Sequence, residues 1–294
     1  MRTATMRAAN AKYYSSKGSR IYSDFSTFAQ GRALARANEI EFCRVFGKRA
    51  GKITVCEYGV GNGNFAKVFL DAVQAKDASL YKRLNYHLFD FSGKMLASSK
   101  RTLVRHTGKC SFSLFDASSG IPSLPFGYCR INELLSDLPA SMQRKGNRCA
   151  DAAQAAFLLR MPDSRQIPFP IAAARFISSL CRLGSKSSMI DIFDYGFYFP
   201  DDILRHPRDE WDRLVARKYG SQVTADLNFP YLAAFIEAEG FECGIEPQRA
   251  YCERALGMKL KLSQTSKGLD YVPALAGDFK EDDGFYHMRI GGMG

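Results

Sequence analysis

The chain has 294 residues, which is enough for one large α/β domain with insertions or for two small domains, and we favour the single domain. Hydrophobic residues make up 46% and charged residues 24%, and no apolar run approaches the roughly 20 residues that cross a bilayer, so we expect a folded, soluble chain without a membrane span. The formal net charge of +11 leaves a polyanionic partner such as nucleic acid open, although the basic residues are spread along the sequence.

Eight cysteines occur singly, without a C-x-x-C pair or a Cys/His cluster at zinc-ligand spacing, so no metal site is expected. Cys56 and Cys181 lie in apolar runs, where a reduced thiol acts as a small core residue. These thiols indicate a reducing compartment, with the cytoplasm favoured over the mitochondrial matrix. The basic N-terminal stretch is similar in composition to a mitochondrial transit peptide, but its tyrosine and isoleucine residues favour packing within the fold.

The spacing of apolar residues predicts alternating helices and strands in the first half of the chain. The expected elements are a helix over 27–49, a strand over 53–57, a glycine turn over 59–63, a helix over 65–74, a strand over 85–89, a helix over 92–103 and strands over 110–115 and 127–131. The fourth strand leads into a helical stretch that Pro139 closes. Such alternation predicts a Rossmann-like α/β fold, with a mostly parallel sheet flanked by helices.

The second half is expected to interrupt this alternation once and then to resume it. The segment at about 139–187 has the proline and glycine content of an insertion, and residues 171–182 read as a helix before a fifth strand over 189–193. Helices over 208–218 and 230–239 and a strand over 241–245 follow. We therefore expect an N-terminal helical segment (1–50) that covers the active site, a core (51–262) with the insertion, and a C-terminal strand or tail (263–294).

A glycine-rich loop follows the first strand directly and precedes a helix: Glu57-Tyr-Gly59-Val-Gly61-Asn-Gly63. Glycines allow positive φ angles and a close approach of the backbone to a ligand. A nicotinamide enzyme would place a third glycine at position 64, which is Asn. The G-x-G-x-G spacing with an acid two residues before it instead resembles the cofactor loop of class I methyltransferases, where Glu57 would meet the amino group of S-adenosylmethionine.

Polar residues also end the later strands, where side chains of an open α/β sheet face the binding crevice. Asp90 follows the second strand and suits the ribose hydroxyls, with Phe91 and Ser92 beside it, and Asp116 ends the third strand near the expected adenine. Asn132, Glu133 and Asp137 follow the fourth strand, and Asp194 and Tyr195 end the fifth. Helix capping and turn formation are the alternative explanations for these residues.

The segments together resemble the MidA-like methyltransferases, which include the mitochondrial complex I assembly methyltransferase. The matching pieces run in family order over about three quarters of the chain: Tyr13-Tyr14, Asp24-Phe25-Ser-Thr27, the Glu57–Gly63 loop, Asp90-Phe-Ser92, Asn132-Glu133 with Leu138-Pro139, Asp194-Tyr195-Gly196, and Thr224-x-Asp226-x-Asn228-Phe229. Tyr58 and Val60 replace the usual Leu and Pro of the loop, Ser23 replaces a Gly, and Ser136 stands where the family often has Asp.

The resemblance implies an S-adenosylmethionine-dependent methyltransferase that acts on a protein side chain, with arginine the leading candidate. It implies a cofactor site of Glu57, Gly59, Gly61, Gly63, Asp90, Phe91, Ser92 and Asp116, and catalytic roles for Glu133 with Asn132, Asp137, Asp194 and Tyr195. Asp24, Phe25 and Thr27 would contact the substrate. A nucleic-acid methyltransferase or binding protein, and an assembly factor with little catalysis, stay open as alternatives, as does the oligomeric state, for which a homodimer is one candidate.

Overall fold

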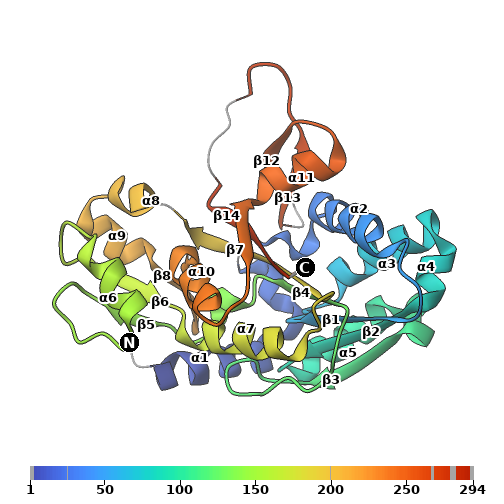
Figure 1. Ribbon diagram of the computed structural model, residues 1–294, viewed down its shortest axis with the longest axis horizontal. Helices are drawn as coiled ribbons and strands as arrows, with labels where there is room; N and C mark the ends of the chain where they lie inside the picture. Colours follow the sequence, from blue (N-terminus) through green and yellow to red (C-terminus); the bar gives the residue numbers. More distant parts are fainter. Residues whose placement is uncertain (1–2, 25, 199, 266–267, 279–282, 292–294) are drawn as a thin grey trace.

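A mixed, mostly parallel sheet runs through the centre of the computed structural model, which describes residues 3–24, 26–198, 200–265, 268–278 and 283–291 (Figure 1). Its strands in spatial order are β11 (Cys243–Pro247), β14 (Phe285–Gly291), β7 (Met189–Phe197), β4 (Tyr128–Asn132), β1 (Ile53–Tyr58), β2 (Leu84–Asp90) and β3 (Cys110–Leu114), with β10 (Leu227–Asn228) beside β7. Strands β3, β2, β1, β4 and β7 are parallel, and β14 is antiparallel to both of its neighbours. The predicted α/β fold with a mostly parallel sheet is confirmed.

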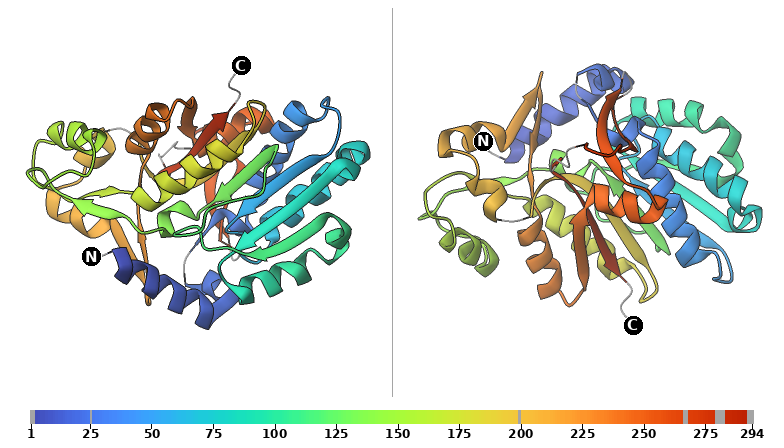
Figure 2. Two further views of the ribbon diagram at one scale, coloured as in Figure 1. Left: turned by 60° about the horizontal axis from the view of Figure 1, so that its bottom comes forward. Right: turned by 90° about the horizontal axis from the view of Figure 1, so that it is seen from above.

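Helices cover both faces of the sheet, and the alternation of side chains along β1 shows why. Ile53 and Val55 point to the face covered by α2 (Ala33–Phe46) and α3 (Asn64–Lys76). Cys56 and Tyr58 point to the other face, covered by α7 (Ile171–Leu183) and α10 (Phe229–Ala238). Since successive strand residues face opposite sides, burial of both sets requires a helix layer on each side. The two helix layers lie on either side of the sheet in Figure 2.

The remaining helices and strands pack around the sheet and its two helix layers. The N-terminal segment consists of α1 (Thr3–Lys17), η1 (Gly18–Ser23) and η2 (Phe28–Gln30), and α1 contacts strand β9. The short antiparallel pairs are β5 (Ser141–Gln143) with β6 (Ile167–Phe169), β8 (Ala216–Tyr219) with β9 (Gln222–Ala225), and β12 (Leu260–Thr265) with β13 (Gly268–Pro273). The other helices are α4 (Ala78–Arg83), α5 (Gly93–Thr102), η3 (Val104–Lys109), η4 (Leu135–Asp137), α6 (Ala152–Leu159), α8 (Pro200–Leu204), α9 (Arg208–Leu214) and α11 (Gln248–Leu256).

The structure corrects two predicted helices. The helix predicted over 208–218 ends at Leu214, because residues 216–219 pair with 222–225 around a two-residue turn in which Gly220 has a φ of 63°. The helical stretch predicted after the fourth strand is a single 3₁₀ turn, η4, which Leu138-Pro139 ends. The segment from residue 263 onward supplies β13 and the sheet strand β14.

In the described part of the chain, none of the helices is both long and apolar enough to cross a membrane. All eight cysteines are free thiols, and Cys56, Cys129, Cys181 and Cys252 are buried as core residues.

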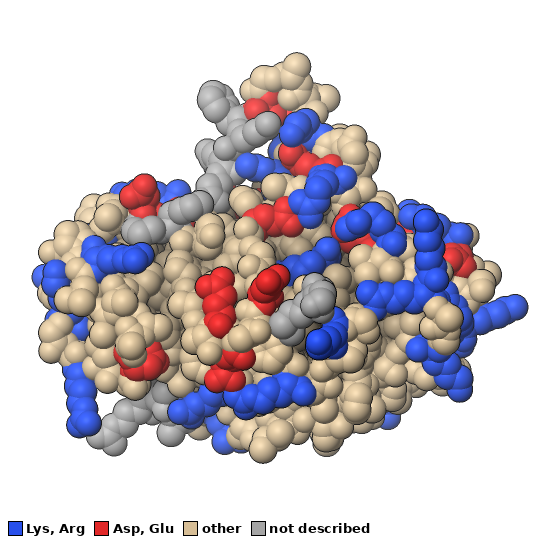
Figure 3. Space-filling model, viewed as in Figure 1, with Lys and Arg blue, Asp and Glu red and all other residues tan. Residues whose placement is uncertain are grey.

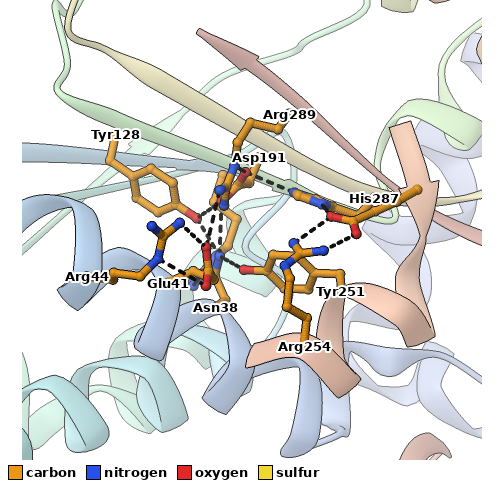
Figure 4. A network of polar contacts seen from close by, with 11 residues as sticks. Asn38, Glu41, Arg44, Tyr128, Asp191, Tyr251, Arg254, His287 and Arg289 are labelled. Carbon is orange, nitrogen blue, oxygen red and sulfur yellow. Dashed lines mark hydrogen bonds and ion pairs between the residues drawn. The ribbon is translucent and has the colours of Figure 1, made fainter. Parts of the chain in front are cut away.

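A network of polar side chains lies between the sheet and helices α2 and α11 (Figure 4). Asp191 of β7 is its centre, since its carboxylate contacts His287 Nε2 at 2.9 Å and accepts hydrogen bonds from Arg289 Nε at 2.7 Å and Tyr128 OH at 2.9 Å. Although burial alone would raise it, the pKa of Asp191 is held far below its usual range by His287 and Arg289. Asp191 therefore carries a fixed negative charge that Arg289 of β14 neutralises.

The same network extends toward the glycine loop through Arg130 of β4, which is fully buried. Arg130 Nη1 donates to Asn38 Oδ1 at 3.0 Å, and Nη2 donates to Glu57 Oε2 at 2.5 Å. Its guanidinium also lies 4.0 Å from the ring centroid of Phe65. Arg130 thereby joins α2, β4 and β1 directly below the loop that follows β1.

We expect Arg130→Met to lower the free energy of unfolding by about 3 to 5 kcal/mol, because Glu57 would keep a buried charge without its cation. Urea denaturation measures this loss. The double variant Glu57→Gln/Arg130→Met removes both charges and should recover more than half of it. A single variant that costs less than about 1 kcal/mol would show that the pair contributes little to stability.

Candidate active site

A cavity of about 170 Å³ lies at the carboxyl ends of the parallel strands. The segments that follow β1, β2, β3 and β4 line it together with Tyr195 near the end of β7. Residues of α1, η1 and β9 line its other sides. Helix α1 is held in place by Asn10, whose amide donates to Asp137 O at 2.9 Å and to Val223 O at 2.8 Å. The N-terminal segment therefore closes one side of the cavity, which Arg7, Asn10, Ala11 and Tyr14 line. Figure 2 shows this segment as the dark blue helix.

The glycine loop turns the chain from β1 into α3 and lies along the cavity at Gly59 and Gly61. Gly61 has a φ of 57°, and a Cβ there would lie 2.4 Å from the hydroxyl of Tyr22. Gly63, with a φ of 80°, precedes the first turn of α3 and would clash with Ser99 at 2.9 Å. Side chains at these two positions are therefore excluded by backbone conformation and by space. Gly63 shapes the loop from outside the cavity.

Asp90 fixes the opposite side of this loop. Its Oδ2 accepts a hydrogen bond from Gly61 N at 3.0 Å and its Oδ1 accepts one from Ser92 N at 2.9 Å. Burial raises its pKa to about 6, although the two amide hydrogen bonds oppose the shift. Phe91 lines the cavity next to Asp90, whereas the Ser92 hydroxyl caps α5 through Met95 N.

Glu57 and Asp116 differ from what the sequence predicts. The Glu57 carboxylate does not line the cavity, because Arg130 and Tyr86 bind it on the α3 side of the sheet. Its structural role is to neutralise Arg130, and it is not placed to meet a ligand amino group. Asp116 does line the cavity, and its Oδ2 accepts a hydrogen bond from Arg7 Nη2 of α1 at 2.6 Å.

Glu133 follows β4 with a φ of 47°, a left-handed conformation that non-glycine residues rarely adopt. This turn points its side chain at the N-terminal segment, where Oε1 accepts hydrogen bonds from Thr27 Oγ1 and Phe28 N, both at 2.8 Å. Burial raises the pKa of Glu133 to about 7, and these hydrogen bonds oppose the shift. The group can therefore take up a proton near neutral pH.

Asp137 is the second carboxylate in the cavity. Tyr14 OH donates to its Oδ2, and Gln222 Nε2 donates to its Oδ1 at 2.9 Å. Burial raises the pKa of Asp137 to about 6. Two buried oxygens that border the cavity, Asn132 Oδ1 and Gln222 Oε1, accept no hydrogen bond from the part of the chain that the structure describes. The cavity therefore offers hydrogen-bond acceptors to a ligand.

Strand β7 carries one residue that lines the cavity, Tyr195, and one acidic residue that lies behind it, Asp194. Tyr195 lines the cavity, with its ring edge-on to Phe285 and the Arg217 guanidinium 5.3 Å from its centroid. Asp194 lies behind the wall and accepts hydrogen bonds from the amides of Leu135 and Ser136 at 2.9 and 3.2 Å. Its role in the structure is to hold η4, so it is not positioned as a base.

The three residues predicted to contact the substrate have different outcomes. Thr27 lines the cavity, whereas Asp24 does not and instead binds Tyr13 OH at 2.5 Å and Lys17. Phe25 lies outside the described residues. The structure adds Tyr14, Tyr22 and Gln222, none of which was predicted as a site residue. Tyr14 belongs to a segment that carries the family resemblance, but Gln222 lies in the hairpin that was partly mistaken for a helix.

Comparison with known proteins shows that the chain is similar to methyltransferases. Residues 37–156 match the model of a family described as "Putative S-adenosyl-L-methionine-dependent methyltransferase". No curated protein matches the sequence.

Solved structures are similar over nearly the whole chain. A "likely methyl transferase" from Burkholderia thailandensis, bound to S-adenosyl-homocysteine, has a TM-score of 0.62 and 15% identity over 90% of this chain and 78% of its own. A second, uncharacterised protein from the same organism has a TM-score of 0.63 and 15% identity over 98% and 92%. A complex of DhpI with SAM and HEP has a TM-score of 0.54 and 12% identity over 99% of both chains.

These structural similarities confirm the predicted class I methyltransferase fold. The family match spans the glycine loop, Asp90, Asp116 and Glu133, and it supports the predicted enzyme class: a methyltransferase with S-adenosylmethionine as cofactor.

We expect Asp90→Ala to weaken S-adenosylmethionine binding by about 1.5 to 3 kcal/mol, the range for a hydrogen bond to a charged group, since the variant loses both the carboxylate and the anchor of Gly61. Isothermal titration calorimetry measures the affinity. Glu242→Ala, which removes a carboxylate after α10, is the matched control. Wild-type affinity in Asp90→Ala would remove this residue from the cofactor site.

The ligand-free protein should become less stable as the pH rises from 5 to 8. Burial raises the pKa of Asp90, Asp137 and Asp226 to about 6, of Glu133 to about 7 and of Asp194 to about 8, whereas unfolded carboxyls titrate near 4. Folding therefore binds protons in this range, and the associated stability is complete below about pH 4 and is lost as the pH rises through 6 to 8. Thermal melts across the range measure the slope, which Glu133→Gln should flatten. A melting temperature that rises with pH would contradict this assignment.

Proposed function

We propose that the enzyme transfers a methyl group to a nitrogen of a protein arginine side chain, as the resemblance to MidA-like methyltransferases implies. The main support for this proposal is that several hydrogen-bond acceptors line the cavity beside Glu133. The carboxylates of Glu133 and Asp137 and the free oxygens of Asn132 and Gln222 all border the cavity. A guanidinium has five N–H donors and no acceptor, so this lining matches it in both charge and hydrogen bonding.

The residues on the other side of the cavity fit the cofactor. Asp90 borders the cavity beside the Gly59–Gly61 backbone, where it would hold the ribose hydroxyls, and Asp116 would meet the adenine amino group. Bound S-adenosylmethionine supplies an electrophilic methyl group on a sulfonium. The chain's own task is to hold the acceptor nitrogen close to that methyl and in line with it.

Glu133 is proposed as the group that orients the guanidinium and takes up its proton. The new N–C bond forms as the S–C bond breaks, and the nitrogen releases one proton, so that the methylated guanidinium keeps a single positive charge. Glu133 accepts that proton, because its raised pKa of about 7 makes it a better base than an exposed carboxylate. Asp137, held by Tyr14 and Gln222, supplies a second negative charge toward the guanidinium. Tyr195 forms the wall beside both acids.

Transfer of a radioactive methyl group from S-adenosylmethionine to proteins in a lysate of the source organism tests the substrate class. The expected result is label in protein that is recovered as methylated arginine after acid hydrolysis. Label in nuclease-sensitive material would instead support the nucleic-acid alternative. Tight cofactor binding without transfer to any fraction would support an assembly factor, and both outcomes would overturn the proposal.

Glu133→Gln tests the mechanism, because glutamine keeps the shape of the side chain but cannot take up the proton. We expect turnover to fall by roughly 100-fold or more with cofactor affinity retained. Calorimetry and thermal melts on the same variant distinguish a structural role, and Glu242→Gln is the matched control. Normal turnover with a lowered melting temperature would remove Glu133 from the mechanism.

A further inference from the structure

The ends of several elements gather basic side chains at the amino edge of β1, β2 and β3, opposite the cavity. We name this surface the basic edge; it comprises Lys48, Arg49, Lys52, Lys82, Arg83, Lys100, Arg101, Arg105 and Lys109. The three segments that carry these residues, 47–52, 78–83 and 100–109, contain nine Lys and Arg and no Asp or Glu. Since the chain's net charge is +11, the basic edge accounts for most of the excess.

Hydrogen bonds join the three segments into one surface. Arg83 Nη1 donates to Arg49 O at 2.5 Å and its Nη2 to Gly47 O at 3.1 Å, which ties the end of α4 to the loop before β1. Lys109 Nζ donates to Lys82 O at 2.5 Å, which ties η3 to α4. Residues spread over more than 60 positions of the sequence therefore lie side by side. Figure 3 shows Lys and Arg gathered on the side of the molecule that carries α3 and α4.

Most of these charges are not neutralised within the chain. Among the described residues, none of the nine forms an ion pair within 4.0 Å, and six of them are exposed: Lys48, Lys52, Lys82, Lys100, Arg101 and Arg105. Several of the cations stand at the ends of α2, α4 and α5, where they also offset the helix dipoles. Dipole compensation needs one or two charges for each helix, and it does not explain Lys52, Arg105 and Lys109 outside those helices.

Aromatic rings lie beneath three of the cations. The Arg49 guanidinium is 4.3 Å from the centroid of Phe46, Lys100 Nζ is 5.6 Å from that of Phe112, and Lys109 Nζ is 5.7 Å from that of Tyr81. Such contacts restrict where the charges lie. The basic edge is poorly suited to insert into a membrane, because its three segments expose a single large apolar side chain, Val104.

We propose that the basic edge binds the phosphodiester backbone of a nucleic acid. Nine cations on one surface attract the phosphates of a nucleic acid, and no base readout is needed for such binding. β1 has six residues, so the edge lies about 20 Å from the cavity at the other end of the strand. The bound nucleic acid is a docking partner and does not supply the methyl acceptor. This inference is independent of the proposed arginine acceptor.

Fluorescence anisotropy with a labelled 20-nucleotide RNA and a DNA duplex of equal length tests the proposal. Wild-type protein is expected to bind both, and four phosphate contacts to the single strand would weaken its affinity roughly 50-fold between about 50 and 200 mM salt. The edge variant combines Lys48→Gln, Lys82→Gln, Arg101→Gln and Arg105→Gln. Its affinity should fall at least about tenfold at the lower salt concentration.

The matched control combines Arg148→Gln, Arg160→Gln, Arg208→Gln and Arg213→Gln, four exposed cations around α6 and α9. Both variants lower the formal net charge from +11 to +7, so only the location of the lost charge differs. The control should bind within about threefold of wild type. Calorimetry with S-adenosylmethionine checks that each variant is folded, and the milder Lys52→Gln/Lys100→Gln variant replaces the edge variant if it is not.

Three outcomes would overturn the proposal. The first is that wild-type protein binds neither nucleic acid at the lower salt concentration. The second is that the edge and control variants lose equal affinity, which would indicate attraction by net charge alone. The third is binding to vesicles that contain phosphatidylserine without binding to RNA or DNA, which would identify the edge as a membrane surface.

Discussion

The buried guanidinium of Arg130 is the interaction on which the arrangement of the site depends. Arg130 lies in the central strand β4 and binds Glu57 at the end of β1 and Asn38 of α2. Asn38 in turn contacts Asp191 of β7, so a continuous polar connection crosses three adjacent strands. Because each charge is buried, loss of one partner leaves another without compensation. The relative positions of β1, β4 and β7 are therefore fixed beneath the cavity.

Two groups of buried acids lie on either side of this connection, and Asp194, which backbone amides hold behind the cavity wall, belongs to neither. Glu57 and Asp191 have cationic partners below the sheet edge, and Asp191 consequently stays ionised. Asp90, Glu133 and Asp137 border the cavity, where amides, hydroxyls and a tyrosine hold them instead. Burial without a cation raises their pKa values. The carboxyl groups at the cavity can therefore still bind a cation or a proton, whereas Glu57 and Asp191 in the core are already paired with cations.

The sequence could predict those parts of the site that depend on local structure. The glycine loop, Asp90 and Glu133 were identified because strand ends and turns leave signals within a few residues. The ion pair of Glu57 could not be predicted, since its partner Arg130 lies 73 residues away and appears in the sequence only as a charge within a strand. Gln222 was not identified, because it meets Tyr14 only through tertiary packing over 208 residues.

Glu133 combines two costs that point to chemistry at this residue. Its left-handed backbone costs on the order of 1 to 2 kcal/mol for a residue with a Cβ, and its carboxylate is buried without a cation. Its own amide donates to Phe193 O at 2.8 Å, which extends the contact of β4 with β7 by one residue and fixes the strained conformation. A glycine would relieve the strain and a glutamine would relieve the charge. Since residues held in such conformations concentrate at functional sites, the presence of both costs in one side chain is the physical reason for proposing proton transfer at Glu133.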